Sequence, residues 1–190
     1  MNQYVKKDFS FKYKSTLGAD FLTTEVIIDD YVVQLQLWDT AGTERFHSMG
    51  CSFYRNTKCC VLVFDLTDQK SFKSIENYRN EFLVNVNPRD PETFPFVLLG
   101  NKCDKEMEIK VQESEIKKYC ENQSNMPYFE TSAKDNTNVE AAFEKVSELA
   151  FERNRDSENN ELYGFRNIEH ERVILAAINQ QGQHKKCCPL

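Results

Sequence analysis

The chain has 190 residues, a length that suits one compact domain with material left for a tail. Its hydrophobic fraction of 40% allows a sizeable core, and its net charge of −6 argues against a nucleic-acid-binding protein, which would usually carry a basic face. No signal peptide precedes its seven cysteines and no apolar run approaches a membrane span, so we expect a reducing cytosol in which most cysteines act as small core residues.

The first 150 residues predict strands that alternate with helices. Residues 24–38 show the apolar–polar alternation of two strands around a turn at Asp29–Asp30. Nearly continuous apolar runs, typical of strands covered on both faces, occupy residues 59–66, 95–101 and 127–133. Apolar residues recur at helical spacing in residues 71–86, 112–122 and 138–152.

This order of elements predicts an α/β doubly wound fold, a mostly parallel sheet with helices on both faces. From about Arg153 the pattern weakens. We therefore expect one domain over residues 1–152 and a variable, largely flexible tail over residues 153–190, with a short helix around 168–179.

Three of the predicted strand ends carry polar motifs. Ligands of a doubly wound sheet bind at the carboxyl ends of its strands. Each motif alone is weak, because an Asp after a strand is more often a turn or cap residue, but their order on successive strand ends is harder to obtain by chance. The motifs are Asp39–Gly42 (DTAG), Asn101–Asp104 (NKCD) and Ser132–Lys134 (SAK).

These motifs resemble those of the Ras-like small GTPases and, within them, of the Rab family. The wider stretches STLGADF (15–21) and PYFETSAKDNTNVEAAFE (127–144) are similar to the late-endosomal branch of the Rab proteins. The resemblance covers roughly Met1 to Glu152. It implies the small GTPase fold and a switch that binds and hydrolyses GTP with Mg²⁺ while it regulates endosomal and vesicular membrane traffic.

For the guanine base, the resemblance implies that Asp104 accepts hydrogen bonds from the ring N–H and the exocyclic amine. Adenine offers no such donor pair, and a buried carboxylate left without partners is unfavourable. Asn101 would hold the loop and reach the base. The methylene stem of Lys102 would cover one face of the ring.

The second base-binding loop is implied at Ser132–Lys134. The backbone N–H of Ala133 would donate to the guanine oxygen, and Ser132 and Lys134 would support the loop. Phe9 occupies the position where the family places an aromatic ring against the base.

On the phosphate side, Thr16 matches the family's switch residue, whose hydroxyl binds Mg²⁺ when the γ-phosphate is present. Asp39 would hold Mg²⁺ through water, and the backbone N–H of Gly42 would touch the γ-phosphate. Loss of that phosphate would release both loops.

An aromatic trio is implied as the surface that binds effectors: Phe21, Trp38 and Phe53. The alternative is that all three are core residues. Other implied partners are an exchange factor, a GTPase-activating protein and a prenylation escort protein.

The chain departs from the family at Thr43, where the family has a Gln that orients the attacking water. Thr is shorter, so we expect slow intrinsic hydrolysis, which a partner can assist in trans. This departure leaves open whether the chain is a GTPase enzyme.

A larger departure is that no G-x-x-x-x-G-K-[ST] loop occurs in the 190 residues. The family's first strand and phosphate loop are not in this sequence, so we expect an N-terminally incomplete GTPase fold with impaired or lost triphosphate binding. In the family that strand lies in the middle of the sheet. We therefore expect two exposed rows of backbone groups and a chain that folds poorly alone.

The sequence ends in HKKCCPL, which is similar to the prenylated ends of Rab proteins. The resemblance implies geranylgeranyl groups on Cys187 and Cys188, and so attachment to the cytosolic face of endosomal membranes. An unmodified polar tail is the alternative. A non-catalytic prenylated interaction protein, with effector surface and anchor but no nucleotide switch, is the alternative function.

Overall fold

In the computed structural model of the chain, residues 1–12, 16, 19–40, 54, 56–159 and 171–179 are described. Six strands in these ranges form one sheet with the order β1-β2-β6-β3-β4-β5. They are β1 (Ala19–Ile28), β2 (Tyr31–Thr40), β3 (Thr57–Asp65), β4 (Phe96–Asn101), β5 (Tyr128–Thr131) and β6 (Glu171–Asn179). β1 and β2 are antiparallel and the other neighbouring pairs are parallel, which confirms the predicted mostly parallel sheet.

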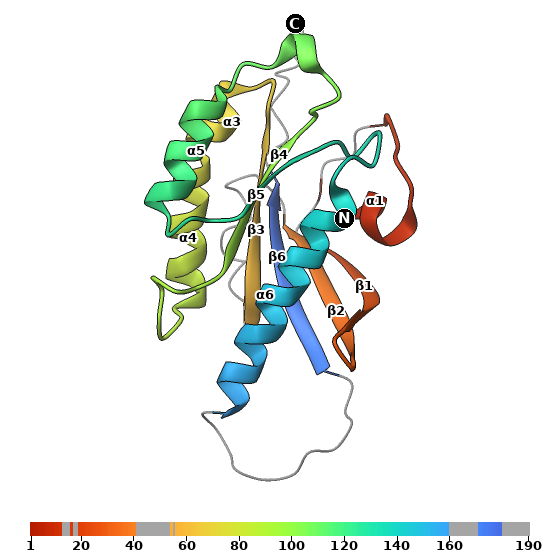
Figure 1. The fold of residues 1–190 in the computed structure, drawn as a ribbon, viewed down its shortest axis with the longest axis vertical. Coiled ribbons are helices and arrows are strands. Elements are labelled where there is room, and N and C mark those ends of the chain that lie inside the picture. The colour runs from red at the N-terminus through yellow and green to blue at the C-terminus, as the bar shows by residue number, and fades with distance from the viewer. Residues whose placement is uncertain (13–15, 17–18, 41–53, 55, 160–170, 180–190) are drawn as a thin grey trace, which may run out of the picture.

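Helices cover both faces of this sheet (Figure 1). The described helices are α1 (Asn2–Lys6), α3 (Gln69–Lys73), α4 (Ile75–Val86), the 3₁₀ helix η2 (Glu106–Glu108), α5 (Glu113–Asn122) and α6 (Val139–Asn159). On one face, Phe143 and Val146 of α6 pack with Leu35 of β2 in one apolar cluster that α1 also joins. On the other face, α3, α4 and α5 pack in a second cluster with β3 and β4. The sheet is therefore the middle layer of three.

The predicted hairpin is present, with its turn at Asp29–Asp30. Asp29 has φ 52°, in the left-handed region that Asp tolerates in turns. Along β2, Val33, Leu35 and Leu37 are at most 1% exposed, as the alternating pattern predicts.

Cysteines of the described residues behave as core side chains, with one partly exposed. Cys59, Cys60 and Cys120 are buried and unpaired, and Cys103 is intermediate. Burial raises the pKa of Cys59 to about 12, so this thiol stays protonated and unreactive at neutral pH.

The helical pattern of residues 71–86 is divided into α3 and α4 at Ser74. The Ser74 hydroxyl donates to the carbonyl oxygen of Lys70 at 3.0 Å, and the Ser74 N–H donates to the same oxygen at 3.2 Å. The Lys70 carbonyl oxygen is thus shared by the side chain and the backbone of Ser74 at the junction of the two helices.

The predicted tail helix around 168–179 is wrong, because residues 171–179 form β6 in the centre of the sheet. The expected rows of exposed backbone groups are also wrong: β6 pairs with both β2 and β3. The β-branched residues Val173, Ile174 and Ile178 favour a strand, and the backbone groups of two adjacent strands require partners. The prediction that the chain folds poorly alone is not tested, and with β6 in place it loses the reason given for it.

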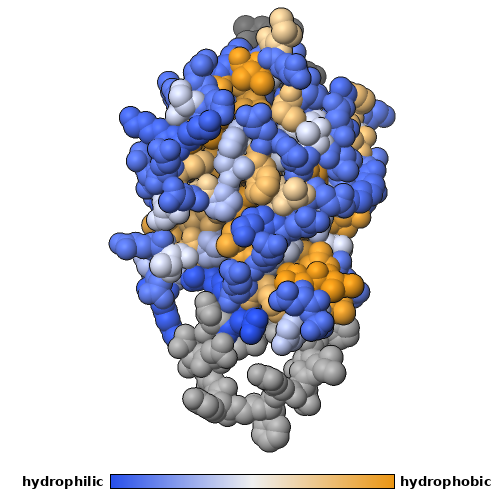
Figure 2. All heavy atoms as spheres, viewed as in Figure 1, coloured by the Kyte–Doolittle hydropathy of each residue, from blue (hydrophilic) through white to orange (hydrophobic). Residues whose placement is uncertain are grey.

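One face of the molecule is mostly hydrophilic, with a hydrophobic patch at the side of the β1–β2 hairpin (Figure 2). Exposed apolar residues of the hairpin include Ile27, Tyr31 and Val32, of which Ile27 is 79% exposed. Apolar residues this exposed are suited to contact with another surface.

Candidate functional site

The carboxyl ends of β3, β4 and β5 lie in a row, as expected of parallel strands. Asp65 pairs with Asn101, and Asn101 pairs in turn with Thr131. The loops that follow β4 and β5 carry the NKCD and SAK motifs, so the fold brings these two motifs together at one edge of the sheet.

Backbone and side-chain hydrogen bonds join the two loops directly. The Ala133 N–H donates to Oδ1 of Asn101 at 3.1 Å, and the Cys103 N–H donates to the carbonyl oxygen of Thr131 at 3.1 Å. Asn101 therefore holds the second loop through its side chain. The positions of the two loops depend on each other.

Asp104 lies in the same cluster with its side chain only 10% exposed. The Ser132 hydroxyl donates to Oδ1 of Asp104 at 2.7 Å, and Nζ of Lys134 lies 3.7 Å from Oδ2. Ser132 in turn accepts the Asp135 N–H at 3.0 Å. A carboxylate offers about four acceptor positions, so Asp104 is oriented by these partners and retains capacity for further N–H donors.

Lys102 adopts a left-handed backbone conformation with φ 69° between these loops. Its Nζ lies 2.6 Å from Oδ2 of Asp65, while Oδ1 of Asp65 accepts from the N–H and the hydroxyl of Thr67 at 2.8 and 2.7 Å. Burial raises the pKa of Asp65, but Lys102 and Thr67 outweigh it and hold that pKa below its ordinary value.

Sequence reasoning missed Asp65. Its only signal was an acid at the end of the apolar run of β3, the same kind of position that marks Asp39 after β2. Because Asp65 orients the Lys102 stem, it belongs to the site as a positioning residue.

At the other predicted site, near the end of β2, Thr16 and Asp39 lie together. The Thr16 hydroxyl is 3.5 Å from Oδ2 of Asp39. Burial raises the pKa of Asp39, the Met1 ammonium group and Thr16 lower it, and Asp20 raises it; the net shift is upward. A desolvated carboxylate beside a hydroxyl suits a hard cation.

Mg²⁺ keeps several waters and uses few protein oxygens, so two oxygen donors fit it. Among the described residues there is no cluster of three or more His, Cys, Asp or Glu side chains that would form an all-protein metal cage. The two oxygen donors of Thr16 and Asp39 fit the few protein ligands that Mg²⁺ takes.

Phe21 and Trp38 of the predicted aromatic trio are in contact. They face each other across β1 and β2, and their ring centroids lie 4.7 Å apart. Phe21 is 42% exposed, so it is not a core residue. Phe9, the predicted base-stacking ring, is 40% exposed and packs edge-on against Phe11 at 5.1 Å.

Five predicted site residues lie outside the described ranges. They are Gly42, Thr43, Phe53, Cys187 and Cys188. Their roles remain predictions from the sequence.

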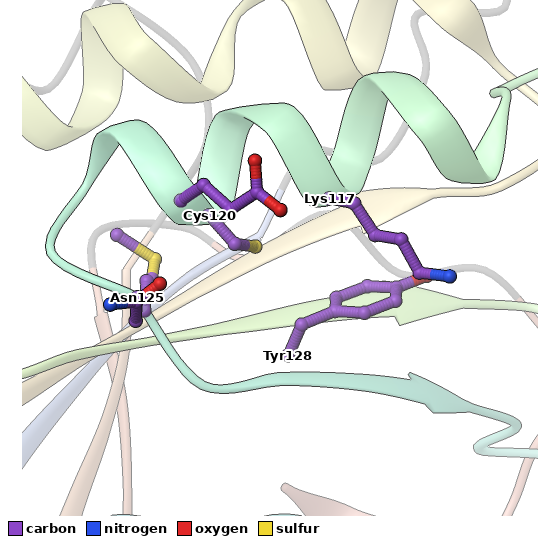
Figure 3. Close-up of a pocket in the computed structure, with 6 residues that line it drawn as sticks. Lys117, Cys120, Asn125 and Tyr128 are labelled. Carbon is purple, nitrogen blue, oxygen red and sulfur yellow. The ribbon is translucent and has the colours of Figure 1, made fainter.

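A pocket of about 200 Å³ lies between α5 and the beginning of β5, away from these motifs (Figure 3). Lys117 and Cys120 of α5 and Tyr128 of β5 line it. It opens near the start of β5, whereas the predicted base-binding loops follow the ends of β4 and β5. The pocket is therefore not part of the candidate site.

Comparison with known proteins shows similarity over most of the chain. The sequence profile described as the Ras family matches residues 1–152. Ras-related protein Rab-7a of Paramecium octaurelia is 53% identical over 158 residues, which cover 83% of this chain and 77% of that protein. Ypt/Rab-type GTPase ypt7 of Schizosaccharomyces pombe is 55% identical over 160 residues, or 84% of this chain and 78% of that protein. Ypt/Rab-type GTPase Rab7 of Neurospora crassa is 54% identical over 151 residues, or 79% of this chain and 74% of that protein.

Proposed function

Because the chain belongs to the Ras family of small GTPases, in its Rab7 branch, we propose that it is a guanine-nucleotide-dependent switch of endosomal vesicle traffic. Nucleotide binding by these 190 residues is weak in this proposal, since they contain no phosphate loop. GTP hydrolysis is slow, because Thr43 stands at the water-orienting position.

The observation that carries the proposal is the preorganised pair of loops around Asp104. Ser132 and Lys134 fix the carboxylate, and Asn101 fixes the Ala133 N–H. The Asp104 carboxylate held in this way complements the N–H and amine donors of guanine. The Ala133 N–H, which donates to Asn101 here, would exchange that bond for one to the guanine oxygen. A site with fixed polar groups discriminates strongly, by about 10⁴-fold or more, against a base that leaves them unpaired.

Two residues bind the base in a different manner. The Lys102 stem covers one face of the ring, held by the Asp65 ion pair. Phe9 contributes an aromatic surface to the same base.

Thr16, Asp39 and Gly42 form the phosphate side of the proposed site. Asp39 would hold Mg²⁺ through water, and the Thr16 hydroxyl, which lies beside Asp39, would bind it only when the γ-phosphate is present. The ion would supply positive charge to the phosphates. The N–H of Gly42 binds the γ-phosphate. The Thr16 hydroxyl lies 3.5 Å from Oδ2 of Asp39, near the end of β2.

The effector surface and the membrane anchor complete the proposal. Phe21, Trp38 and Phe53 bind effectors. An exchange factor and a GTPase-activating protein act on the nucleotide site. Geranylgeranyl groups on Cys187 and Cys188, delivered by an escort protein, attach the chain to endosomal membranes. No helix in the described ranges is long and apolar enough to cross a membrane.

The test is the base preference of the 190-residue chain. We would measure the affinities of GDP, ADP and XDP by calorimetry, with and without Asp104→Asn. The chain should prefer GDP over ADP. Asp104→Asn should lose that preference and favour XDP, because xanthine presents a carbonyl oxygen where guanine has its amine and the Asn amide can donate to it.

A matched control is Glu106→Gln, which makes the same kind of change on the exposed η2 helix and should leave all three affinities unchanged. Equal affinities for GDP and ADP would contradict guanine recognition. No binding of any nucleotide would favour the non-catalytic interaction protein. That alternative agrees with the absence of a phosphate loop from these residues.

A further inference from the structure

Strand β6 is paired along both of its sides. Its register with β2 runs from Glu171 opposite Val33 to Ile178 opposite Thr40. Its register with β3 runs from Ile174 opposite Thr57 to Asn179 opposite Val63. β2 and β3 are not neighbours in the sheet, so β6 is what connects the β1–β2 hairpin to β3, β4 and β5.

The two strands that flank β6 belong to the deepest part of the fold. Val33 and Leu35 of β2, and Cys59 and Cys60 of β3, are 0% exposed. Backbone N–H and C=O groups in such surroundings require hydrogen-bond partners, and water cannot replace them without opening the core. The facing edges of β2 and β3 therefore require an extended segment between them that offers a full set of backbone donors and acceptors.

Residues 171–179 have the composition that such a position requires. The run Val173–Ile178 is continuously apolar and contains neither Pro nor Gly, while Glu171, Arg172 and Asn179 at its ends are polar. Continuous apolar runs are typical of central parallel strands with both faces covered. Pro is confined to edges and bulges, so its absence agrees with a central place.

The connection to β6 has the form of an ordinary crossover. α6 follows the carboxyl end of β5 and returns along the sheet, so α6 ends toward the end of the sheet at which β6 begins (Figure 1). The intervening residues 160–170 lie outside the described ranges. A helix between two parallel strands is the usual way to join them.

We propose that the space between β2 and β3 is a strand-binding site for an extended apolar peptide parallel to both neighbours, and that the chain fills it with its own residues Glu171–Asn179. The tail then is a structural part of the domain, and folding of these 190 residues depends on it. This inference does not rest on nucleotide binding or on prenylation.

The first test is amide hydrogen exchange on the unmodified 190-residue chain. Amides of residues 172–178 should exchange at least about a thousand-fold more slowly than in an unstructured peptide, together with those of β2 and β3. Exchange of the 172–178 amides at the unstructured rate, with β3 protected, would overturn the proposal.

The second test is Leu175→Pro in the full chain, which removes one backbone donor from the middle of β6. The cooperative thermal transition should be lost. Leu175→Val keeps the N–H and an apolar side chain, so it is the matched control and should retain the transition.

A synthetic peptide of residues 171–179 makes this test specific. Added to the Leu175→Pro chain, it should restore the transition with a midpoint that rises with peptide concentration. The same peptide with Pro at position 175 should have no effect. Failure of the unmodified peptide to restore the transition would contradict a strand-binding site, and a stable dimer of the unmodified chain would contradict pairing within one chain.

Discussion

Lys102 and Asp65 form an ion pair across adjacent strand ends, with Nζ and Oδ2 2.6 Å apart. Lys102→Met should therefore destabilise the chain at pH 7 by about 1 kcal/mol. This modest value reflects a Lys side chain that is 47% exposed, against an Asp side chain that is 13% exposed. Urea unfolding with a shared slope measures the difference.

The effect of Lys102→Met should depend on pH. The pKa of Asp65 is lowered in the fold, so its contribution to stability is present above the unfolded value of 3.8 and is lost as pH falls through the folded pKa. The difference between the two proteins should vanish at the lowest pH at which both stay folded. Equal differences at acid and neutral pH would show that packing of the Lys stem, not charge, is lost.

Asp39→Asn should stabilise the chain at pH 7 in the absence of nucleotide and Mg²⁺. The pKa of Asp39 is raised above 3.8 in the fold, so stability is fully present below that unfolded value and is lost as pH rises through the folded pKa. The Asn side chain avoids that loss, and the gain should shrink below about pH 4. Melting temperatures at a series of pH values measure it.

The control for this measurement is Asp30→Asn, a change of the same chemistry in the exposed hairpin turn. It should shift the melting temperature little. A fall in stability for Asp39→Asn at pH 7 would mean that the carboxylate is stabilised by its neighbours and that its pKa is not raised.

Gly100→Ala should destabilise the chain by about 1–3 kcal/mol through overpacking. A Cβ at Gly100 would lie 2.7 Å from Oη of Tyr128 and 3.1 Å from side-chain atoms of Leu66 and Phe64. Tyr128→Phe removes the nearest of these atoms. In the double variant the loss should be smaller than the sum of the two single losses, as measured by a double-mutant cycle; additive losses would show that Oη is not the obstacle.

Thr43→Gln should speed single-turnover GTP hydrolysis in a version of the chain to which a phosphate loop has been restored. A Gln side chain can orient the attacking water in a way that the shorter Thr cannot. Nucleotide affinity should stay the same, because the change acts on the water. Equal rates for the two proteins would remove Thr43 as the reason for slow hydrolysis.

The sequence sufficed to predict the hairpin and the paired base loops because their signals are local. Val33, Leu35 and Leu37 alternate with polar residues, and this alternation reports a strand with one buried face. Parallel strands end at one edge, so the loops after β4 and β5 had to meet, and the hydrogen bond from Ala133 to Asn101 is the result.

The sequence pattern could not predict that residues 171–179 form a central strand, for a physical reason. By periodicity alone, a continuous apolar run such as Val173–Ile178 can be a buried strand or a buried helix. The neighbouring strands determine which of the two forms, because the facing edges of β2 and β3 can pair with a strand and cannot pair with a helix. Asp65 was missed in a similar way, since only the fold places Lys102 within reach.

The place of β6 also determines how the molecule would be tethered. Asn179 lies at the carboxyl edge of the sheet, near Thr16 and Asp39, and only residues 180–186 separate it from Cys187. Fully extended, eight residues reach about 28 Å, so lipid groups on the cysteines would hold the bilayer within that distance of the nucleotide edge. A free tail from Arg153 onward would allow the domain to stand well away from the membrane and to rotate. Under the proposal that Cys187 and Cys188 carry lipid groups, pairing of residues 171–179 in the sheet leaves residues 180–186 as the link to the membrane. A protein that exchanges the nucleotide would then have to act in the narrow gap between the domain and the lipid.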